Sequence, residues 1–124
     1  MKRGEIWTVA GGGNYAGKPR PAVILQEDQF ETMDSVTVCF FTSNELEAPF
    51  FRIKIDPSTH NNLRTPCSLM ADKITTVPKT KLGYRIGHLA AADILRLNQA
   101  ILVFLGLAAS PRVAIRASTA RDGS

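Results

Sequence analysis

Most of the chain alternates apolar with polar residues or gathers apolar residues in short blocks, which predicts a protein built mainly from β-strands. The alternation is cleanest at 51–55, where Ile53 and Ile55 are predicted to face inward and Arg52 and Lys54 outward. The segment 21–26 is apolar almost throughout, which favours burial of both its faces. The predicted strands are residues 4–10, 21–26, 36–41, 50–55, 68–77 and 85–89.

A C-terminal helix is predicted over residues 91–108 and is expected to end before Pro111. Ile94, Leu97 and Ile101 recur at helical spacing and would face the core. At residues 102–105 the helix would be apolar around almost its whole circumference. A terminal helix of a small domain is expected to have this character only if a second surface covers its outer face. Because burial of a Leu or Phe contributes roughly 1.5–3 kcal/mol, this end of the helix predicts self-association as a homodimer.

Length and composition indicate one globular domain: 124 residues, 44% hydrophobic and 21% charged. The formal net charge is +4. Three arginines and one aspartate from residue 110 onward give that tail +2, which leaves only +2 for residues 1–109. We therefore divide the chain into a domain, 1–109, and a basic tail, 110–124, that is predicted to be flexible. With so small a charge on the domain, nucleic-acid binding would depend on local sites.

Several classes of site and location are not supported. Cys39 and Cys67 have no metal or redox spacing, and Cys39 lies in an apolar run typical of the core. His60 and His88 stand alone in the sequence, and no phosphate-loop or dinucleotide motif is present. We predict no metal and no cofactor. The longest apolar run, residues 100–105, is too short to span a bilayer, and no secretory signal is visible, so we expect a soluble cytoplasmic protein.

Polar residues gather where the predicted apolar strands end. Arg20 lies between two prolines, which restrict its backbone at the start of an apolar strand. Thr42 and Ser43 follow another strand, and Asp72 and Lys73 interrupt a third. Simpler interpretations remain open: the Pro-Arg-Pro segment as a stiff loop end, the hydroxyls as turn caps, and the Asp-Lys pair as an exposed ion pair.

This set of side chains suits a phosphodiester substrate. A guanidinium can contact two phosphate oxygens at once, and neighbouring hydroxyls can share in proton transfer. Without a metal, the simplest phosphodiester reaction is cleavage of RNA by its own 2′-hydroxyl. The protein then assists proton transfer and stabilises charge on the pentacoordinate phosphate.

Five motifs in the same order make the chain resemble the MazF/PemK toxins of bacterial type II toxin–antitoxin systems. They are KRGEIW at 2–7, GKPRPAVI at 17–24, FTS at 41–43, DKITTV at 72–77 and IGHL at 86–89. The resemblance implies a mainly β fold, an SH3-like or CcdB-like β-barrel with a C-terminal α-helix, usually a homodimer. It also implies a sequence-specific, metal-independent endoribonuclease that cleaves single-stranded RNA and is neutralised by a cognate antitoxin.

The resemblance also implies site residues. Arg20 matches an arginine that stabilises the phosphate transition state, Thr42 a hydroxyl residue that works beside it, and Asp72 an acidic position that some members use as a base. These three are the predicted catalytic residues. The predicted RNA-binding residues are Asn14, Tyr15, Lys18, Ser43 and Lys73.

The chain departs from some members of the family at two places. Asn14 and Tyr15 stand where some members have a histidine, and Tyr15 could instead stack on a base of single-stranded RNA. Met70 stands where some have an arginine two residues before the aspartate. These departures favour an Arg20–Thr42 pair over an Arg–Asp acid–base pair. Two other functions are considered: a non-catalytic gyrase-poisoning toxin of the same fold, and a barrel that only binds nucleic acid.

Overall fold

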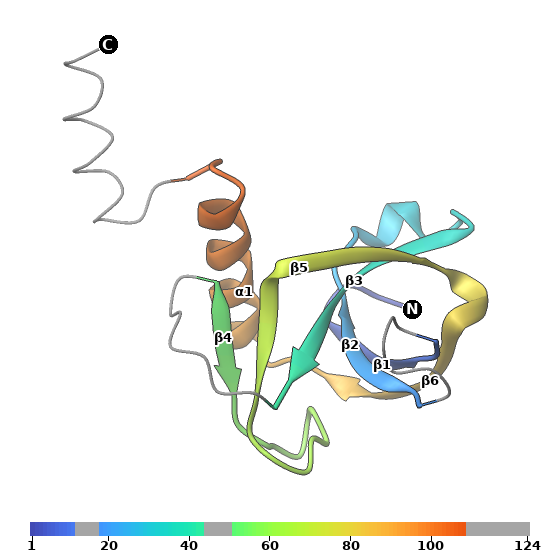
Figure 1. The fold of residues 1–124 in the computed structure, drawn as a ribbon, viewed down its shortest axis with the longest axis horizontal. Coiled ribbons are helices and arrows are strands. Elements are labelled where there is room, and N and C mark those ends of the chain that lie inside the picture. The colour runs from blue at the N-terminus through green and yellow to red at the C-terminus, as the bar shows by residue number, and fades with distance from the viewer. Residues whose placement is uncertain (12–17, 44–50, 109–124) are drawn as a thin grey trace, which may run out of the picture.

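Six strands and one α-helix form the part of the chain that the computed structural model describes, residues 1–11, 18–43 and 51–108 (Figure 1). The elements are β1 (Glu5–Val9), β2 (Arg20–Ile24), β3 (Ser35–Thr42), β4 (Arg52–Ile55), β5 (Cys67–Pro78), β6 (Leu82–His88) and α1 (Ala91–Phe104). Two short 3₁₀ helices, Asp28–Phe30 and Lys79–Lys81, lie between them. Each predicted strand is present, with ends shifted by a few residues.

The strands form one antiparallel sheet in the order β4-β5-β3-β2-β1-β6. The sheet curls strongly, and its long strand β5 bends on the way from its pairing with β4 near its start to the far end of its pairing with β3 (Figure 1). The two edge strands, β4 and β6, do not pair with each other. The mainly β fold with a C-terminal helix is confirmed, whereas the predicted barrel is not closed.

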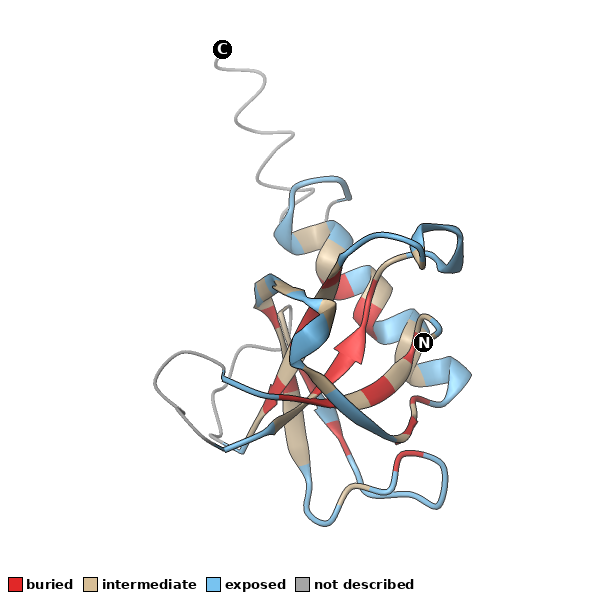
Figure 2. Cartoon of the chain, turned by 90° about the vertical axis from the view of Figure 1, so that its right-hand side faces the viewer, coloured by how far each residue is buried: buried red, intermediate tan, exposed pale blue. Residues whose placement is uncertain are grey.

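Strand β2 is buried on both faces, as its apolar sequence predicts. Val23 belongs to the larger core cluster, which also includes Leu97 of α1. Ala22 and Ile24 belong to a second cluster, which includes Val38. Figure 2 shows the buried residues concentrated in the central strands and on the inner side of the helix. Residues 22–24 of β2 are therefore packed on both faces, while Arg20 and Pro21 at its start are only partly buried.

The N-terminal segment joins the sheet to the helix. Arg3 donates from Nε to the Leu25 carbonyl at 2.6 Å and from a terminal nitrogen to Asn98 Oδ1 at 2.6 Å. Gly4 has φ +89°, and a Cβ there would lie 2.8 Å from Ile94 Cδ1. Only glycine fits this turn and this close approach. These residues of the 2–7 motif therefore have a structural role.

The helix ends earlier than predicted. Its last residue is Phe104, and Gly106 follows with φ +76°. The Gly106 amide donates to the Val103 carbonyl at 3.1 Å and the Leu107 amide to the Leu102 carbonyl at 2.8 Å, the hydrogen bonds of a Schellman cap. The prediction that the helix continues to residue 108 was wrong because it relied on Pro111 and overlooked the glycine.

The C-terminal end of α1 carries large apolar side chains that the rest of the described chain leaves exposed. They are Leu102 and Phe104, together with Leu105 and Leu107 just after the helix; Leu95, near the start of α1, is exposed as well. No helix within residues 1–11, 18–43 and 51–108 is long and apolar enough to cross a membrane. The predicted flexible tail, 110–124, lies outside the described residues.

Candidate active site

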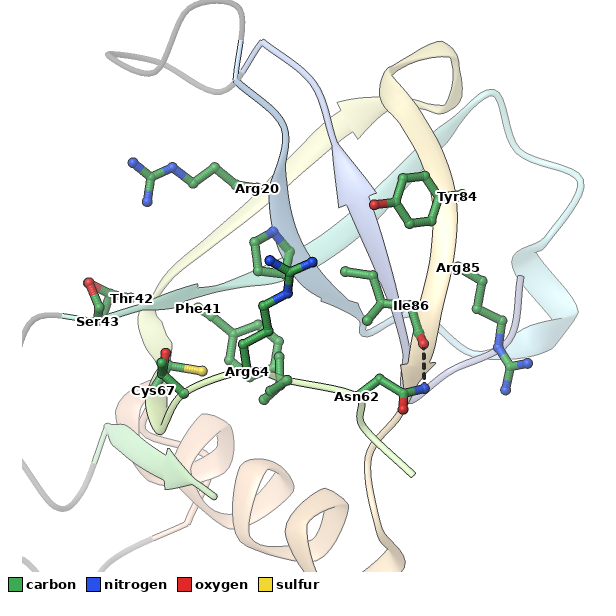
Figure 3. Close-up of a pocket in the computed structure, with 13 residues that line it drawn as sticks. Arg20, Phe41, Thr42, Ser43, Asn62, Arg64, Cys67, Tyr84, Arg85 and Ile86 are labelled. Atoms are coloured by element: carbon green, nitrogen blue, oxygen red, sulfur yellow. Dashed lines mark hydrogen bonds between the residues drawn. The ribbon is translucent and has the colours of Figure 1, made fainter. Parts of the chain in front are cut away.

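An open pocket of about 510 Å³ lies where β2, β3 and β6 meet the chain between β4 and β5 (Figure 3). The residues that line it are Arg20, Pro21, Phe41, Thr42, Ser43, Asn62, Leu63, Arg64, Thr65, Cys67, Tyr84, Arg85 and Ile86. Three of the predicted site residues, Arg20, Thr42 and Ser43, are therefore brought to one surface although they come from different parts of the sequence.

Strand pairing explains how Arg20 and Thr42 come together. Strand β2 begins at Arg20 and β3 ends at Thr42, and the two strands are antiparallel with Ala22 opposite Phe40. The recorded pairing ends at Ala22 and Phe40, so Arg20 and Thr42 each lie two residues beyond it, at the same end of the two strands. Arg20 and Thr42 thus lie at the same end of two neighbouring interior strands, and their catalytic roles remain predictions.

The chain between β4 and β5 is held in place by Asn61, which is only 2% exposed. Its Oδ1 accepts hydrogen bonds from the Ser58 amide at 2.9 Å and the Leu63 amide at 3.0 Å. Its Nδ2 donates to the Asp56 carbonyl at 2.9 Å. One buried amide side chain therefore closes this loop by bonding three backbone groups.

The same loop is fixed against β6, which positions Arg64 at the pocket. Asn62 Nδ2 donates to the Ile86 carbonyl at 2.9 Å. A Cβ on Gly87 would lie 2.4 Å from the His60 carbonyl oxygen, so the loop backbone packs directly on this glycine. Arg64 was not predicted, because a lone arginine in an irregular loop carries no periodic signal. Figure 3 shows its guanidinium in the space between Arg20 and Tyr84.

Strand β6 contributes Tyr84 and Arg85, which point in different directions (Figure 3). Arg85 Nε forms an ion pair with Glu5 at 3.0 Å, whereas the Tyr84 side chain is exposed. Partial burial raises the pKa of Glu5, but hydrogen bonds from the Lys2 amide and the Trp7 indole, together with the Arg85 guanidinium, bring that pKa below its usual value. Arg85 is therefore committed to a charged partner, and Tyr84 is not.

Asp72 does not line the pocket. Its carboxylate accepts two hydrogen bonds from Arg52, from Nε at 2.8 Å and from a terminal nitrogen at 3.0 Å. The Arg52 side chain is only 9% exposed, so the prediction that it faces solvent was wrong. Arg52 stands opposite Met70 in the sheet, and its guanidinium reaches Asp72 on the neighbouring strand. The hydrogen bonds from Arg52 hold the pKa of Asp72 below its usual value.

The predicted RNA-binding residues have different placements. Ser43 lines the pocket, whereas Lys18 and Lys73 are exposed and do not line it. Asn14 and Tyr15 lie outside the described residues.

Both cysteines are free thiols with different surroundings. Cys39 is fully buried, as predicted, and burial raises the pKa of its thiol to about 12. Cys67 lines the pocket, and partial burial raises the pKa of its thiol as well.

The two histidines, isolated in the sequence, are neighbours in space. The His60 and His88 rings meet edge to face with centroids 5.3 Å apart. Within the described part of the chain, no group of three or more His, Cys, Asp or Glu side chains is arranged to hold a metal ion.

Comparison with known proteins gives a consistent result. A family model described as "PemK-like, MazF-like toxin of type II toxin-antitoxin system" matches residues 2–105. "Probable endoribonuclease MazF" of Mycolicibacterium smegmatis is 50% identical over 108 residues, which are 87% of this chain and 99% of that protein. "Endoribonuclease MazF9" of Mycobacterium tuberculosis is 29% identical over 116 residues, 86% of this chain and 98% of that protein.

The fold is also found among solved structures. An endoribonuclease from a mycobacterial species, solved in complex with its cognate antitoxin, superposes with a TM-score of 0.74. The match covers 89% of this chain and 99% of that chain, at 22% sequence identity. At this identity the likeness is one of fold.

Proposed function

The chain belongs to the PemK-like, MazF-like toxin family of type II toxin–antitoxin systems, and on this premise we propose that it cleaves single-stranded RNA in the pocket beside Arg20. It is an endoribonuclease toxin, which the comparisons support over a gyrase-poisoning toxin or a simple binding module. We further propose that it acts in the cytoplasm and that a cognate antitoxin neutralises it.

One observation carries the assignment of the site. Arg20 and Thr42, from adjacent strands, line the same open pocket as a further cation, Arg64. An RNA phosphate at this pocket would meet two guanidinium groups, each able to donate two parallel hydrogen bonds to phosphate oxygens. Because residues 1–109 carry little net charge, this local pair supplies the positive potential that a phosphate needs.

The reaction proposed is attack by the 2′-hydroxyl oxygen of one nucleotide on its own 3′-phosphorus. A bond forms between O2′ and phosphorus, and the bond from phosphorus to O5′ of the next nucleotide breaks. The 2′-hydroxyl loses a proton and O5′ gains one, so the products are a 2′,3′-cyclic phosphate and a 5′-hydroxyl. The nucleophile is part of the substrate, so the reaction requires no metal-activated water.

Arg20 and Thr42 would act at different points of this reaction. The Arg20 guanidinium donates to the non-bridging oxygens, where negative charge grows in the pentacoordinate transition state. The Thr42 hydroxyl both donates and accepts hydrogen bonds, so it can orient the attacking 2′-hydroxyl beside that phosphate. Ser43 follows Thr42 and is proposed to bind RNA, as are Asn14, Tyr15, Lys18 and Lys73.

Substitution of Arg20 tests the site. Arg20→Ala should lower the cleavage rate by about 10²–10³, the usual effect of removing one transition-state donor. The matched control is Lys54→Ala, which removes a positive charge from an exposed position on β4 that does not line the pocket. Reactions contain EDTA, and a substrate with 2′-deoxyribose at the cut position should resist cleavage. Cutting of that substrate would refute the 2′-hydroxyl mechanism.

A homodimer is also proposed. The exposed leucines at the C-terminal end of α1 and just after it, Leu102, Leu105 and Leu107, would lose contact with water if a second copy packed on them. Leu102→Asp places a charge in this apolar surface and should shift the sedimentation of the protein at micromolar concentration from dimer to monomer. Sedimentation of the unsubstituted protein as a strict monomer would contradict the proposal.

A further inference from the structure

Tyr84 is the most exposed aromatic side chain among the described residues, with 68% of its surface accessible. It lines the pocket that contains Arg20 and Arg64. Within the described chain its hydroxyl makes no hydrogen bond. Neither core packing nor hydrogen bonding therefore accounts for a large aromatic ring at this position.

A β-bulge places Tyr84. Leu82 pairs with Val9 and Arg85 with Trp7, and the register shifts between these two pairs. Two residues of β6, Gly83 and Tyr84, thus stand opposite the single residue Thr8. A bulge of this kind disturbs the regular alternation of side chains and redirects the one it carries.

Thr8 and Gly83 stabilise this bulge. The Thr8 side chain is buried, and its hydroxyl oxygen accepts a hydrogen bond from the Tyr84 amide at 3.0 Å. A Cβ on Gly83 would lie 2.2 Å from the same Thr8 oxygen, so any side chain at this position would displace the Thr8 hydroxyl from its hydrogen bond. The backbone of Tyr84 is therefore fixed although its ring is exposed.

Figure 3 shows the direction that results. The Tyr84 ring lies on the side of β6 that faces Arg64 and Arg20, and its hydroxyl end points toward them. Arg85 extends the other way, to Glu5. The Tyr84 ring thus stands across the pocket from the proposed phosphate-binding arginines.

We propose that Tyr84 is a stacking platform for an unpaired RNA base next to the phosphate that Arg20 holds. This inference rests on the proposed function and adds a specific positioning residue to it. Single-stranded RNA offers bases with free faces, which stack on aromatic side chains beside cationic groups that bind the backbone. The backbone of Tyr84 is fixed, and its side chain has only two rotatable torsions, so the ring can reach only a small region, which limits where one base lies relative to the scissile bond.

The test begins with binding to an RNA that cannot be cut. The probe is a fluorescent single-stranded oligonucleotide that contains a mapped cut site with 2′-deoxyribose at the attacking nucleotide, and anisotropy gives its Kd. Tyr84→Ala should raise the Kd by roughly 5- to 150-fold, the range for loss of one base–aromatic stack. Tyr84→Phe and Tyr84→Trp should stay within about twofold of the wild type, because both retain a ring.

The matched control is Phe30→Ala, which removes an exposed ring outside the pocket and should leave the Kd unchanged. A second arm uses probes with one abasic nucleotide beside the cut site. At the position that stacks, the abasic probe should bind the wild type more weakly but lose nothing further with Tyr84→Ala. With cleavable RNA, Tyr84→Ala should raise KM while kcat changes little.

Each other outcome overturns the inference. Wild-type affinity in Tyr84→Ala, alongside an inactive Arg20→Ala, refutes the platform and leaves the proposed cleavage site intact. Equal losses in Tyr84→Phe and Tyr84→Ala would assign the effect to the hydroxyl instead of the ring. Unchanged RNA affinity with altered sedimentation would make Tyr84 a protein contact. Failure of the wild type to bind any RNA would refute the platform and the proposed function together.

Discussion

Asp72→Asn separates a catalytic carboxylate from a structural one. The substitution keeps the shape of the side chain and removes its charge, so Arg52 loses the partner to which it donates at 2.8 and 3.0 Å. The structure places this pair outside the pocket-lining residues. We therefore expect a loss of stability with little change in kcat, although the family resemblance makes Asp72 a candidate base.

Burial sets the size of the expected loss. The Arg52 and Asp72 side chains are 9% and 17% exposed, so the pair is more buried than a surface ion pair. Exposed pairs contribute up to about 1 kcal/mol, and breaking a buried pair costs roughly 3–5 kcal/mol. We expect an intermediate loss of about 2–3 kcal/mol here. For a domain of this length, that corresponds to a decrease in Tm of roughly 6–15 °C.

The loss should depend on pH in a defined direction. Hydrogen bonds from Arg52 lower the pKa of Asp72 in the folded protein, so its carboxylate stabilises the fold above its usual pKa. This contribution disappears as the pH falls through the lowered folded pKa. The stability difference between wild type and Asp72→Asn should thus be constant near neutral pH and shrink in acid.

Urea unfolding followed by circular dichroism gives the stability, and cleavage of a saturating RNA substrate gives kcat. Asp34→Asn is the control, because Asp34 is exposed and its side chain makes no ion pair among the described residues. Loss of a general base lowers the rate by about 10² or more. If Asp72→Asn lowered kcat by this much but kept the stability of the wild type, the structural role would be refuted and Asp72 would be the base.

Two further expectations concern the walls of the pocket. Gly87→Ala should destabilise the protein by roughly 1–3 kcal/mol and lower kcat/KM. A Cβ at this position would lie 2.4 Å from the His60 carbonyl oxygen and would displace the loop that carries Arg64. Urea unfolding measures the stability, and steady-state kinetics measures kcat/KM. If Gly87→Ala had the stability of the wild type, the loop between β4 and β5 would be able to move away from the added Cβ without cost. Alkylation of the native protein should modify Cys67 and leave Cys39, which is fully buried with its pKa raised to about 12. Bound RNA should slow the alkylation of Cys67, as measured by mass spectrometry. An unchanged rate of alkylation would show that RNA does not bind in this pocket.

The strands and the Arg20–Thr42 pair could be predicted because they depend on local signals. Apolar periodicity locates the strands, and polar residues at their ends indicate an edge of the sheet. Antiparallel pairing of Ala22 with Phe40 then brings Arg20 and Thr42 to the same end of β2 and β3, where both line the pocket. The burial of β2 on both faces follows from its continuous apolar run.

The other features depend on contacts between distant segments. Arg64 reaches the pocket because Asn61 closes an irregular loop, and Tyr84 because a bulge opposite Thr8 breaks the alternation of β6. No periodic pattern of apolar and polar residues in the sequence signals either the loop or the bulge. Arg52 was assigned to solvent by alternation alone, since the position of Asp72 on the next strand is a property of register.

Mapping of the RNA ends made by wild type, Arg20→Ala and Thr42→Ala in the presence of EDTA tests the central claim most directly. Sequencing of a long RNA after each reaction gives the cut positions, and the chemistry of the ends gives the mechanism. We expect discrete cuts with 2′,3′-cyclic phosphate and 5′-hydroxyl ends, formed about 10²–10³ times more slowly by folded Arg20→Ala. Wild-type rates at the same positions in Arg20→Ala would contradict the assignment of this pocket as the active site.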